Sequence, residues 1–364
     1  MDKYKIAIVT WITYHNFGTF LQAFALQKVI TSLGYENTII SDKKIVESFR
    51  NRINLRVFLG KIRRIFCSYS KINNRTDVSL LCYEQFLKQY LVIDDNWTDF
   101  KELNNNYDAF ICGSDQIWSP NVPFHPFYYL GFTNKKKVAY APSIGSFDYP
   151  ENRISLVKPY LKKFSFLSVR EIQGEKIIKE KFCLDCQTVL DPTLLLVKAD
   201  YEELVTKRED KSYILCYLLT YNETYLSFVR EYANKKGLEL RIFITDFRYI
   251  AYADKPLYVG PQEFLNEIRN STCFFSDSFH GSIFALQFEK DFYIFKRFKD
   301  CAKNNQNSRI INLFGKLGLL HRFLSEKELE SVGHLDVIDY ISVKRLLNKE
   351  REISLTYLKT ALEK

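Results

Sequence analysis

FFSDSFHGSIFALQF, residues 274–288, places polar side chains and a glycine between two apolar runs. The run STCFF (271–275) is typical of a short buried strand, and SIFALQF (282–288) has helical spacing. DFYIFKR (291–297) is typical of a second strand. In a parallel sheet, the turn between such a strand and helix lies at the carboxyl end of the strand, where ligands bind. The stretch therefore predicts a strand, a ligand-facing turn, a helix and a strand.

The polar residues of this turn suit two interpretations. Ser276, Asp277 and Ser278 are alternative caps for the following helix. His280 would then lie beside the helix start, where N–H groups and the helix dipole favour an anion. An imidazole beside an anion is a candidate proton donor. Ser and Asp also cap many helices that bind nothing, so the turn alone leaves both interpretations open.

The same alternation of strands and helices extends along the chain. KIAIVTW (5–11) and ENTIIS (36–41) are typical of strands on either side of an amphipathic helix that ends at Gly34. This β-α-β opening favours a parallel sheet. The charged stretch 198–211 is typical of a linker, and the alternation restarts with SYILCYLL (212–219). The fold class is therefore predicted as α/β, with two Rossmann-like lobes that face a cleft.

With 364 residues, the chain exceeds one typical core. We expect an N-terminal lobe at 1–200, a C-terminal lobe at 211–325 and a helical tail at 326–364. Three turns that follow strands are expected to line the cleft: YHNFG (14–18), GSDQIW (113–118) and SDSFHG (276–281). The sequence contains no G-x-G-x-x-G fingerprint and no phosphate-binding P-loop.

The composition indicates where the protein resides and whether it binds a metal ion. No apolar run approaches the roughly 20 residues of a transmembrane helix, and the first apolar run is too short for a signal peptide. We therefore expect a cytoplasmic protein. Several of the eight cysteines lie in apolar, strand-like runs, which predicts buried free thiols. Cys183 and Cys186 form a lone C-x-x-C without the second ligand pair of a zinc site, so no metal site is predicted.

One segment carries most of the net charge. The formal net charge is +9, and eight Lys and Arg residues lie from Arg50 to Arg75 without an Asp or Glu. Apolar residues recur among them at helical spacing, which predicts a basic amphipathic helix. Such a helix packs on its own domain, or it contacts an anionic membrane surface or a lipid-phosphate-linked substrate. Basic and acidic residues balance elsewhere, so nucleic acid is not an expected partner.

Several stretches together resemble the polysaccharide pyruvyl transferase family, and they occur in the family's order from Lys5 to about Arg322. They are YHNFGTFLQAFAL, FICGSDQIW, VAYAPSIGS, LSVRE, VLDPTLLL, YVGPQEFLNEIRNSTCFFSDSFHGSIFALQF and NSRIINLFGKLGL. The resemblance implies a two-lobed fold similar to that of the GT-B glycosyltransferases. It also implies transfer of a pyruvyl group from phosphoenolpyruvate to a sugar of a surface polysaccharide or its precursor, as in capsule or exopolysaccharide synthesis. The product is a ketal across two hydroxyls, and no cofactor besides this donor substrate is expected.

The resemblance associates His280 with donor binding and catalysis. The family often carries Arg two residues before this His, whereas this sequence has Ser278. Phosphoenolpyruvate carries a carboxylate and a phosphate, so the missing guanidinium matters. Either another cation replaces it or the donor differs. The candidate cations are Arg170, Lys296, Arg297 and Arg309, of which the first and last lie in matching stretches.

The implied reaction assigns roles to further residues. It needs an acid for the methylene carbon of the donor, a base for the sugar hydroxyl and cations for the donor's anionic groups. His280 is the expected acid, and Asp115 or His15 is a candidate base. The predicted donor-binding residues are Arg170, Ser278, Gly281, Ser282 and Arg309. The predicted acceptor-binding residues are His15, Asn16, Ser114 and Gln116.

Two other functions stay open at this point. One is a nucleotide-sugar-dependent glycosyltransferase of the same two-lobed fold. The other is a non-catalytic binding protein of a glycan-assembly complex, which the missing Arg at Ser278 keeps open. The 50–75 segment further predicts a lipid-linked acceptor and peripheral contact with the inner face of the cell membrane.

Overall fold

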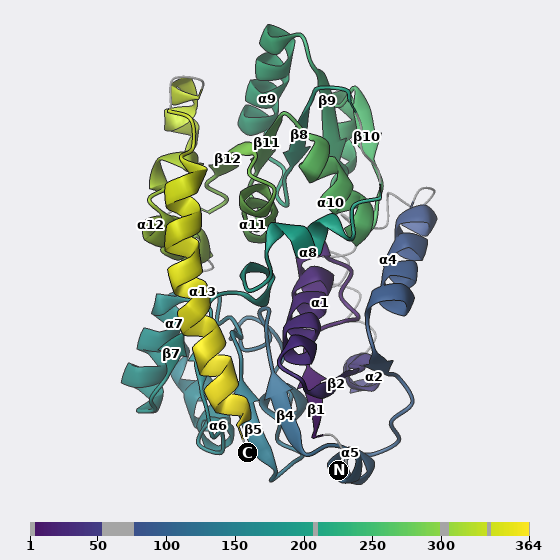
Figure 1. The fold of residues 1–364 in the computed structure, drawn as a ribbon, viewed down its shortest axis with the longest axis vertical. Coiled ribbons are helices and arrows are strands. Elements are labelled where there is room, and N and C mark those ends of the chain that lie inside the picture. Colours follow the sequence, from purple (N-terminus) through teal and green to yellow (C-terminus); the bar gives the residue numbers. More distant parts are fainter. Residues whose placement is uncertain (1–3, 53–75, 207–209, 299–305, 333–335, 364) are drawn as a thin grey trace.

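The computed structural model describes residues 4–52, 76–206, 210–298, 306–332 and 336–363 (Figure 1). The predicted basic helix falls largely on 53–75, which lies outside these ranges. Figure 1 shows two α/β lobes, one above the other, with the longest helix running along one side of both.

The N-terminal lobe is built on a five-stranded parallel sheet of order β3-β2-β1-β4-β5. Its strands are β1 (Lys5–Val9), β2 (Glu36–Ile40), β3 (Ile93–Asp94), β4 (Ala109–Cys112) and β5 (Lys136–Ala139). The strand residues of β1 and β4 are almost completely buried, as is typical of a parallel sheet covered on both faces. Helices of this half are α1 (Phe17–Ser32), α2 (Lys43–Arg52), α4 (Thr76–Tyr90), α5 (Phe100–Asn106), α6 (Glu151–Leu161), α7 (Ile172–Ile177) and α8 (Lys198–Glu202).

A short parallel pair continues this half of the molecule beyond β5. It consists of β6 (Ser168–Val169) and β7 (Gln187–Thr188), and a bridge between Val138 and Phe166 connects it to β5. From QTVLDPTLLL (187–196) the sequence predicts a strand that stops at the proline, and the observed strand β7 covers only Gln187–Thr188. Asp191 accepts a hydrogen bond from the backbone N–H of Thr193 and starts a 3-10 turn at Pro192–Leu194, which ends the extended chain.

The C-terminal lobe has a six-stranded parallel sheet of order β10-β9-β8-β11-β12-β13. Its strands are β8 (Tyr213–Tyr217), β9 (Glu239–Phe243), β10 (Lys255–Leu257), β11 (Cys273–Ser276), β12 (Asp291–Phe295) and β13 (Phe323–Leu324). Its helices are α9 (Glu223–Lys236), α10 (Pro261–Asn270), α11 (Phe279–Gln287) and α12 (Ser308–Leu317). The opening stretch of the sequence forms β11, the turn and α11, but the helix begins at Phe279, before the predicted SIFALQF run.

Helix α1 connects the cores of the two lobes. It is apolar on nearly all faces and buries most of its side chains. Phe17 at its start stacks on Phe264 of α10, with ring centroids 4.4 Å apart, and contacts Tyr217 and Phe243 of the C-terminal sheet. One continuous cluster of buried apolar residues therefore includes both lobes.

Two segments predicted as linker and tail pack against the lobes. Within the charged stretch 198–211, α8 buries Tyr201 against Phe284 of α11, because the aromatic ring gains more from this contact than from exposure. Helix α13 (Tyr340–Leu362) crosses from the C-terminal to the N-terminal lobe (Figure 1). Its Tyr357 hydroxyl donates to the Ala139 carbonyl at the end of β5, at 2.9 Å.

Candidate active site between the lobes

Polar side chains from both lobes meet where the strands of each sheet end. Arg170 follows β6, Asp191 follows β7 and Asp115 follows β4, whereas His280 lies in the first turn of α11 after β11. All four side chains are buried. Because the carboxyl ends of parallel strands carry the ligand sites of α/β folds, this cluster is the candidate active site.

His280 is held between two parts of the N-terminal lobe. Of the three possible caps, Ser278 caps α11, and its hydroxyl accepts a hydrogen bond from the Gly281 N–H at 3.2 Å. The imidazole Nε2 lies 3.6 Å from Asp191 Oδ2, which is longer than a hydrogen bond. On the other side, Nδ1 lies 1.9 Å from the position that a Cβ atom would take at Gly18. Glycine at the start of α1 therefore makes room for the ring.

Arg170 and Asp191 form a fully buried ion pair. Arg170 Nη1 donates to Asp191 Oδ2 at 2.5 Å, and the other Asp191 oxygen accepts hydrogen bonds from the backbone N–H and hydroxyl of Thr193. Burial alone would raise the pKa of Asp191. The charge of Arg170 and contacts from His280 and Thr193 outweigh burial and hold this pKa well below its usual range. Asp191 is therefore ionised at all ordinary pH values.

One edge of the Arg170 guanidinium has no hydrogen-bond partner although it is buried. Its Nε and Nη2 atoms lie 3.6 Å from Glu171 Oε1 and 4.0 Å from Asp115 Oδ1, distances that give attraction but no hydrogen bond. These two N–H groups point in parallel, the geometry that binds a carboxylate or phosphate through two bonds. Buried donors without partners are rare; here Glu171 and Asp115 balance part of the charge of this edge, while its N–H groups stay without a hydrogen bond.

Arg309 of α12 brings a second guanidinium to the cluster. The Phe279 ring lies 4.8 Å from the guanidinium carbon of Arg170 and 5.5 Å from that of Arg309, so both cations contact one aromatic ring. Burial and the charge of Arg170 lower the pKa of Arg309 to about 9. Its Nε atom is also buried without a partner, as is His280 Nε2. The cluster thus combines two guanidinium groups with the carboxylates of Asp115, Glu171 and Asp191, and leaves nitrogens of Arg170, Arg309 and His280 without a hydrogen-bond partner.

Asp115, Ser114 and Gln116 lie at the border of this cluster. Asp115 accepts a hydrogen bond from the Thr19 hydroxyl at 2.5 Å and one from the Gln116 N–H. The Ser114 hydroxyl lies 2.8 Å from the Ala141 carbonyl and 3.3 Å from Asp191. With the Gln116 amide oxygen facing Arg309, both terminal nitrogens of that arginine lie 3.1 Å from it.

Other predicted site residues have structural partners instead. The His15 ring contacts Phe20 and Tyr83 of α4, and the Asn16 side chain caps α1 by accepting from the Gly18 N–H at 2.9 Å. The described contacts of both residues therefore lie outside the cluster.

The start of α11 also differs from expectation. The Gly281 N–H is taken by the cap, the Ser282 N–H bonds within the helix to the Ser278 carbonyl, and the Ser282 hydroxyl donates to Phe279. These groups of Gly281 and Ser282 are engaged in helix formation.

Sequence reasoning missed three residues of the cluster. Asp191 and Glu171 stand in matching stretches, VLDPTLLL and LSVRE, but their buried contacts depend on the meeting of distant segments. Phe279 lies before the predicted helix at 282–288, where the sequence indicates no role for it. The sequence offered one signal for Asp191: it stands directly before Pro192, at the end of a strand-like run.

Asp277 is buried beside the site but faces its own lobe. Its two oxygens accept the backbone N–H groups of Leu219 and Thr220 at 2.6 and 3.1 Å. Burial raises its pKa to about 6, although the charge of Arg297 and these hydrogen bonds oppose the shift. With both oxygens engaged, Asp277 is not available to bind the hydroxyls of a ribose.

Two further findings concern the described part of the chain. It contains no group of three or more His, Cys, Asp or Glu that could hold a metal ion, and Cys183 and Cys186 are free thiols. No helix within the described ranges is long and apolar enough to cross a membrane.

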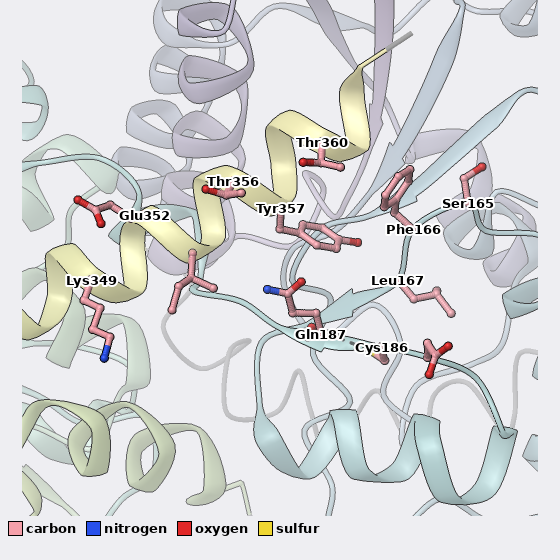
Figure 2. Close-up of a pocket in the computed structure, with 12 residues that line it drawn as sticks. Ser165, Phe166, Leu167, Cys186, Gln187, Lys349, Glu352, Thr356, Tyr357 and Thr360 are labelled. Atoms are coloured by element: carbon pink, nitrogen blue, oxygen red, sulfur yellow. Dashed lines mark hydrogen bonds between the residues drawn. The ribbon is translucent and has the colours of Figure 1, made fainter.

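An open groove of about 850 Å³ lies elsewhere, between α13 and the β6–β7 segment (Figure 2). Phe166, Gln187 and Tyr357 are among the side chains that line it, and none of the cluster residues does. The groove is therefore separate from the candidate active site.

The solved structures that resemble this chain identify the class of its fold. A putative UDP-N-acetylglucosamine 2-epimerase from Listeria monocytogenes has a TM-score of 0.53 at 11% identity, over 96% of this chain and 91% of that one. S. aureus MnaA with UDP has a TM-score of 0.52 at 10% identity, over 96% and 91%. An alpha-glucosyltransferase with UDP and a 13-mer DNA has a TM-score of 0.51 at 11% identity, over 98% and 95%. The chain thus has the two-lobed fold of GT-B glycosyltransferases and these epimerases.

The sequence identifies the family within this class. The family model for polysaccharide pyruvyl transferase matches residues 16–297, most of the chain. This protein belongs to the polysaccharide pyruvyl transferase family. No curated protein matched the sequence.

The contact between Gly18 and His280 predicts the effect of one added methyl group. In Gly18→Ala the new Cβ would overlap the His280 ring, so the ring or the lobe contact must shift. We expect the free energy of unfolding to fall by about 1–3 kcal/mol, the usual cost of overpacking. Urea denaturation measures it.

Gly315→Ala in α12 is the matched control. A Cβ at Gly315 meets no atom within 4 Å, so this substitution should stabilise the helix by about 0.5–1 kcal/mol. Wild-type stability in Gly18→Ala would show that the lobes do not enclose His280 in this way.

Proposed function

We propose that this protein transfers a pyruvyl group from phosphoenolpyruvate to two hydroxyls of a sugar in a surface polysaccharide or its precursor, forming a ketal. One observation carries the proposal: Arg170, Arg309 and His280 all contact the Phe279 ring, and each of these three side chains has a buried nitrogen without a hydrogen-bond partner. Membership of the family supports the same chemistry.

The donor's charges complement this arrangement. Phosphoenolpyruvate presents a carboxylate and a phosphate on adjacent atoms, and two guanidinium groups around Phe279 offer one cation to each. The Arg170 edge suits two-bond recognition of either group. Because the site is buried, each such bond is stronger than it would be in water.

The proposed reaction begins with proton transfer. His280 donates a proton to the methylene carbon of the donor, which leaves positive charge on C2. One sugar hydroxyl attacks C2 and loses its proton to a base, for which Asp115 is the candidate. A second hydroxyl of the same sugar then attacks C2 and gives its proton to His280, which restores the acid. The C–O bond to phosphate breaks, and phosphate leaves with the electron pair and takes up the proton held by the base. The products are the ketal and inorganic phosphate.

Another arginine would replace the one that this sequence lacks at position 278. The Ser278 hydroxyl caps α11, so its side chain serves the helix. Arg309, from α12, contacts the same Phe279 ring as Arg170. We assign to Arg309 the second donor-binding guanidinium, the role that an arginine at 278 would otherwise have.

A thermal-shift panel tests the donor. It compares phosphoenolpyruvate, phosphate, pyruvate and nucleotide sugars on the wild type and on His280→Ala and Arg170→Ala. A ligand at 100 times its Kd stabilises by about 2.7 kcal/mol. We expect the wild type to respond more to phosphoenolpyruvate than to phosphate, and Arg170→Ala to lose this response.

The other outcomes of the panel point to the alternatives. A response to a nucleotide sugar instead would favour glycosyl transfer, to which the same fold is suited. If no member of the panel stabilises the wild type, a non-catalytic binding protein becomes the better proposal.

The substitution Arg309→Met tests donor binding by Arg309 separately from the thermal stability of the free protein. A buried cation without a full counter-charge destabilises the free protein, and its lowered pKa reports this cost. Methionine removes this desolvation cost but also the hydrogen bond from Arg309 to Gln306, so the two effects oppose each other. We expect Arg309→Met to keep a Tm near that of the wild type and to abolish the stabilisation by phosphoenolpyruvate.

Arg345→Met, on the exposed side of α13, is the matched control and should change neither the Tm nor the stabilisation by phosphoenolpyruvate. An unchanged response of Arg309→Met to phosphoenolpyruvate would remove Arg309 from the donor site.

The acceptor and the membrane form a separate part of the proposal. A lipid-linked acceptor and peripheral contact with the inner face of the membrane rest on the basic composition of residues 50–75. Replacing Arg63 and Arg64 by Gln should weaken co-sedimentation with vesicles of anionic lipid, because each basic residue near such a surface contributes about 1 kcal/mol. Equal sedimentation of variant and wild type would contradict this part alone.

A further inference from the structure

Asp191 is the side chain that contacts both the cation and the imidazole of the site. Its Oδ2 atom lies 2.5 Å from Arg170 Nη1, 3.3 Å from Ser114 Oγ and 3.6 Å from His280 Nε2. Arg170 and Ser114 belong to the N-terminal lobe, whereas His280 belongs to the C-terminal lobe. One carboxylate oxygen thus connects the two halves of the site.

The surroundings of Asp191 require a carboxylate. Its Oδ1 atom accepts the N–H and the hydroxyl of Thr193 at 3.0 and 2.6 Å, and its Oδ2 atom faces the donors of Arg170 and His280. Asparagine at this position would turn an NH₂ group toward one of these sets of donors and leave it unsatisfied. The side chain has no exposed surface, so water cannot relieve the mismatch.

We propose that Asp191 is the positioning residue of this site, and that its carboxylate fixes the guanidinium of Arg170 and the imidazole of His280 relative to each other across the two lobes. By binding Nη1, Asp191 orients the guanidinium so that its Nε–Nη2 edge, which makes no hydrogen bond, lies beside Glu171 and Asp115. By facing Nε2 at 3.6 Å, its negative charge holds the imidazole beside the ion pair. The value of this arrangement for catalysis rests on the proposed function; the arrangement itself does not.

Titration of the histidine rings by NMR tests the proposal without any substrate. The chain contains five His residues, and His280→Gln identifies the signal of His280 in the full-length protein. An opposite charge within about 4–6 Å shifts such a titration by about 1–3 pH units. In Asp191→Asn the midpoint of the His280 signal should therefore move down by about one pH unit or more.

Two further variants control for folding and for charge. Asp185→Asn changes an exposed carboxyl in the same segment and should leave the signal unchanged. Asp191→Glu keeps the charge and should titrate closer to the wild type than Asp191→Asn does. Circular dichroism checks that each variant folds, and Asp191→Ala serves if Asp191→Asn does not.

The outcomes separate this inference from the proposed function. An unchanged midpoint in a folded Asp191→Asn or Asp191→Ala would overturn the positioning role. A shifted midpoint in a protein whose wild type ignores phosphoenolpyruvate would support the role of Asp191 and reject the donor. A shifted midpoint together with a tenfold or greater loss of preference for phosphoenolpyruvate over phosphate in Asp191→Asn would support both.

Discussion

The candidate site depends on the ion pair between Arg170 and Asp191, which has almost no contact with water. Removing a charge from water costs several kcal/mol, and a close partner with further hydrogen bonds is needed to offset it. Thr193 and Ser114 supply those bonds for Asp191, whereas Arg170 keeps two N–H groups unsatisfied. The pair is therefore stable enough to stay buried, and Arg170 keeps hydrogen-bonding capacity that the described residues do not use.

The two lobes contribute unlike parts to this arrangement. The N-terminal lobe supplies the ion pair and the glycine that accommodates the imidazole, and the C-terminal lobe supplies His280, Phe279 and Arg309. The apolar core that both lobes share around α1 holds these residues in place relative to each other, because Phe17 packs against the C-terminal sheet immediately before Gly18. The first turn of α1 therefore contributes both to the packing between the lobes and to the candidate site.

The sequence was sufficient for the fold and for part of the site. Periodicity and turn residues predicted the strands and helices of both lobes, and the SDSFHG turn indicated His280, because local patterns reflect local structure. The contacts of Asp191, Glu171 and Arg309 join segments far apart in the chain, which no local pattern encodes. The same limit explains Gly281 and Ser282, whose N–H groups looked free for an anion until the Ser278 cap was seen.

The glycine at position 18 has a consequence for how the reaction avoids water. With the His280 ring enclosed between α1 and Asp191, the cluster is almost sealed in this conformation. In the proposed reaction, a cationic carbon formed at such a place would meet only the hydroxyls already bound there, without competition from solvent. Entry of the proposed sugar and donor would then require the lobes to separate.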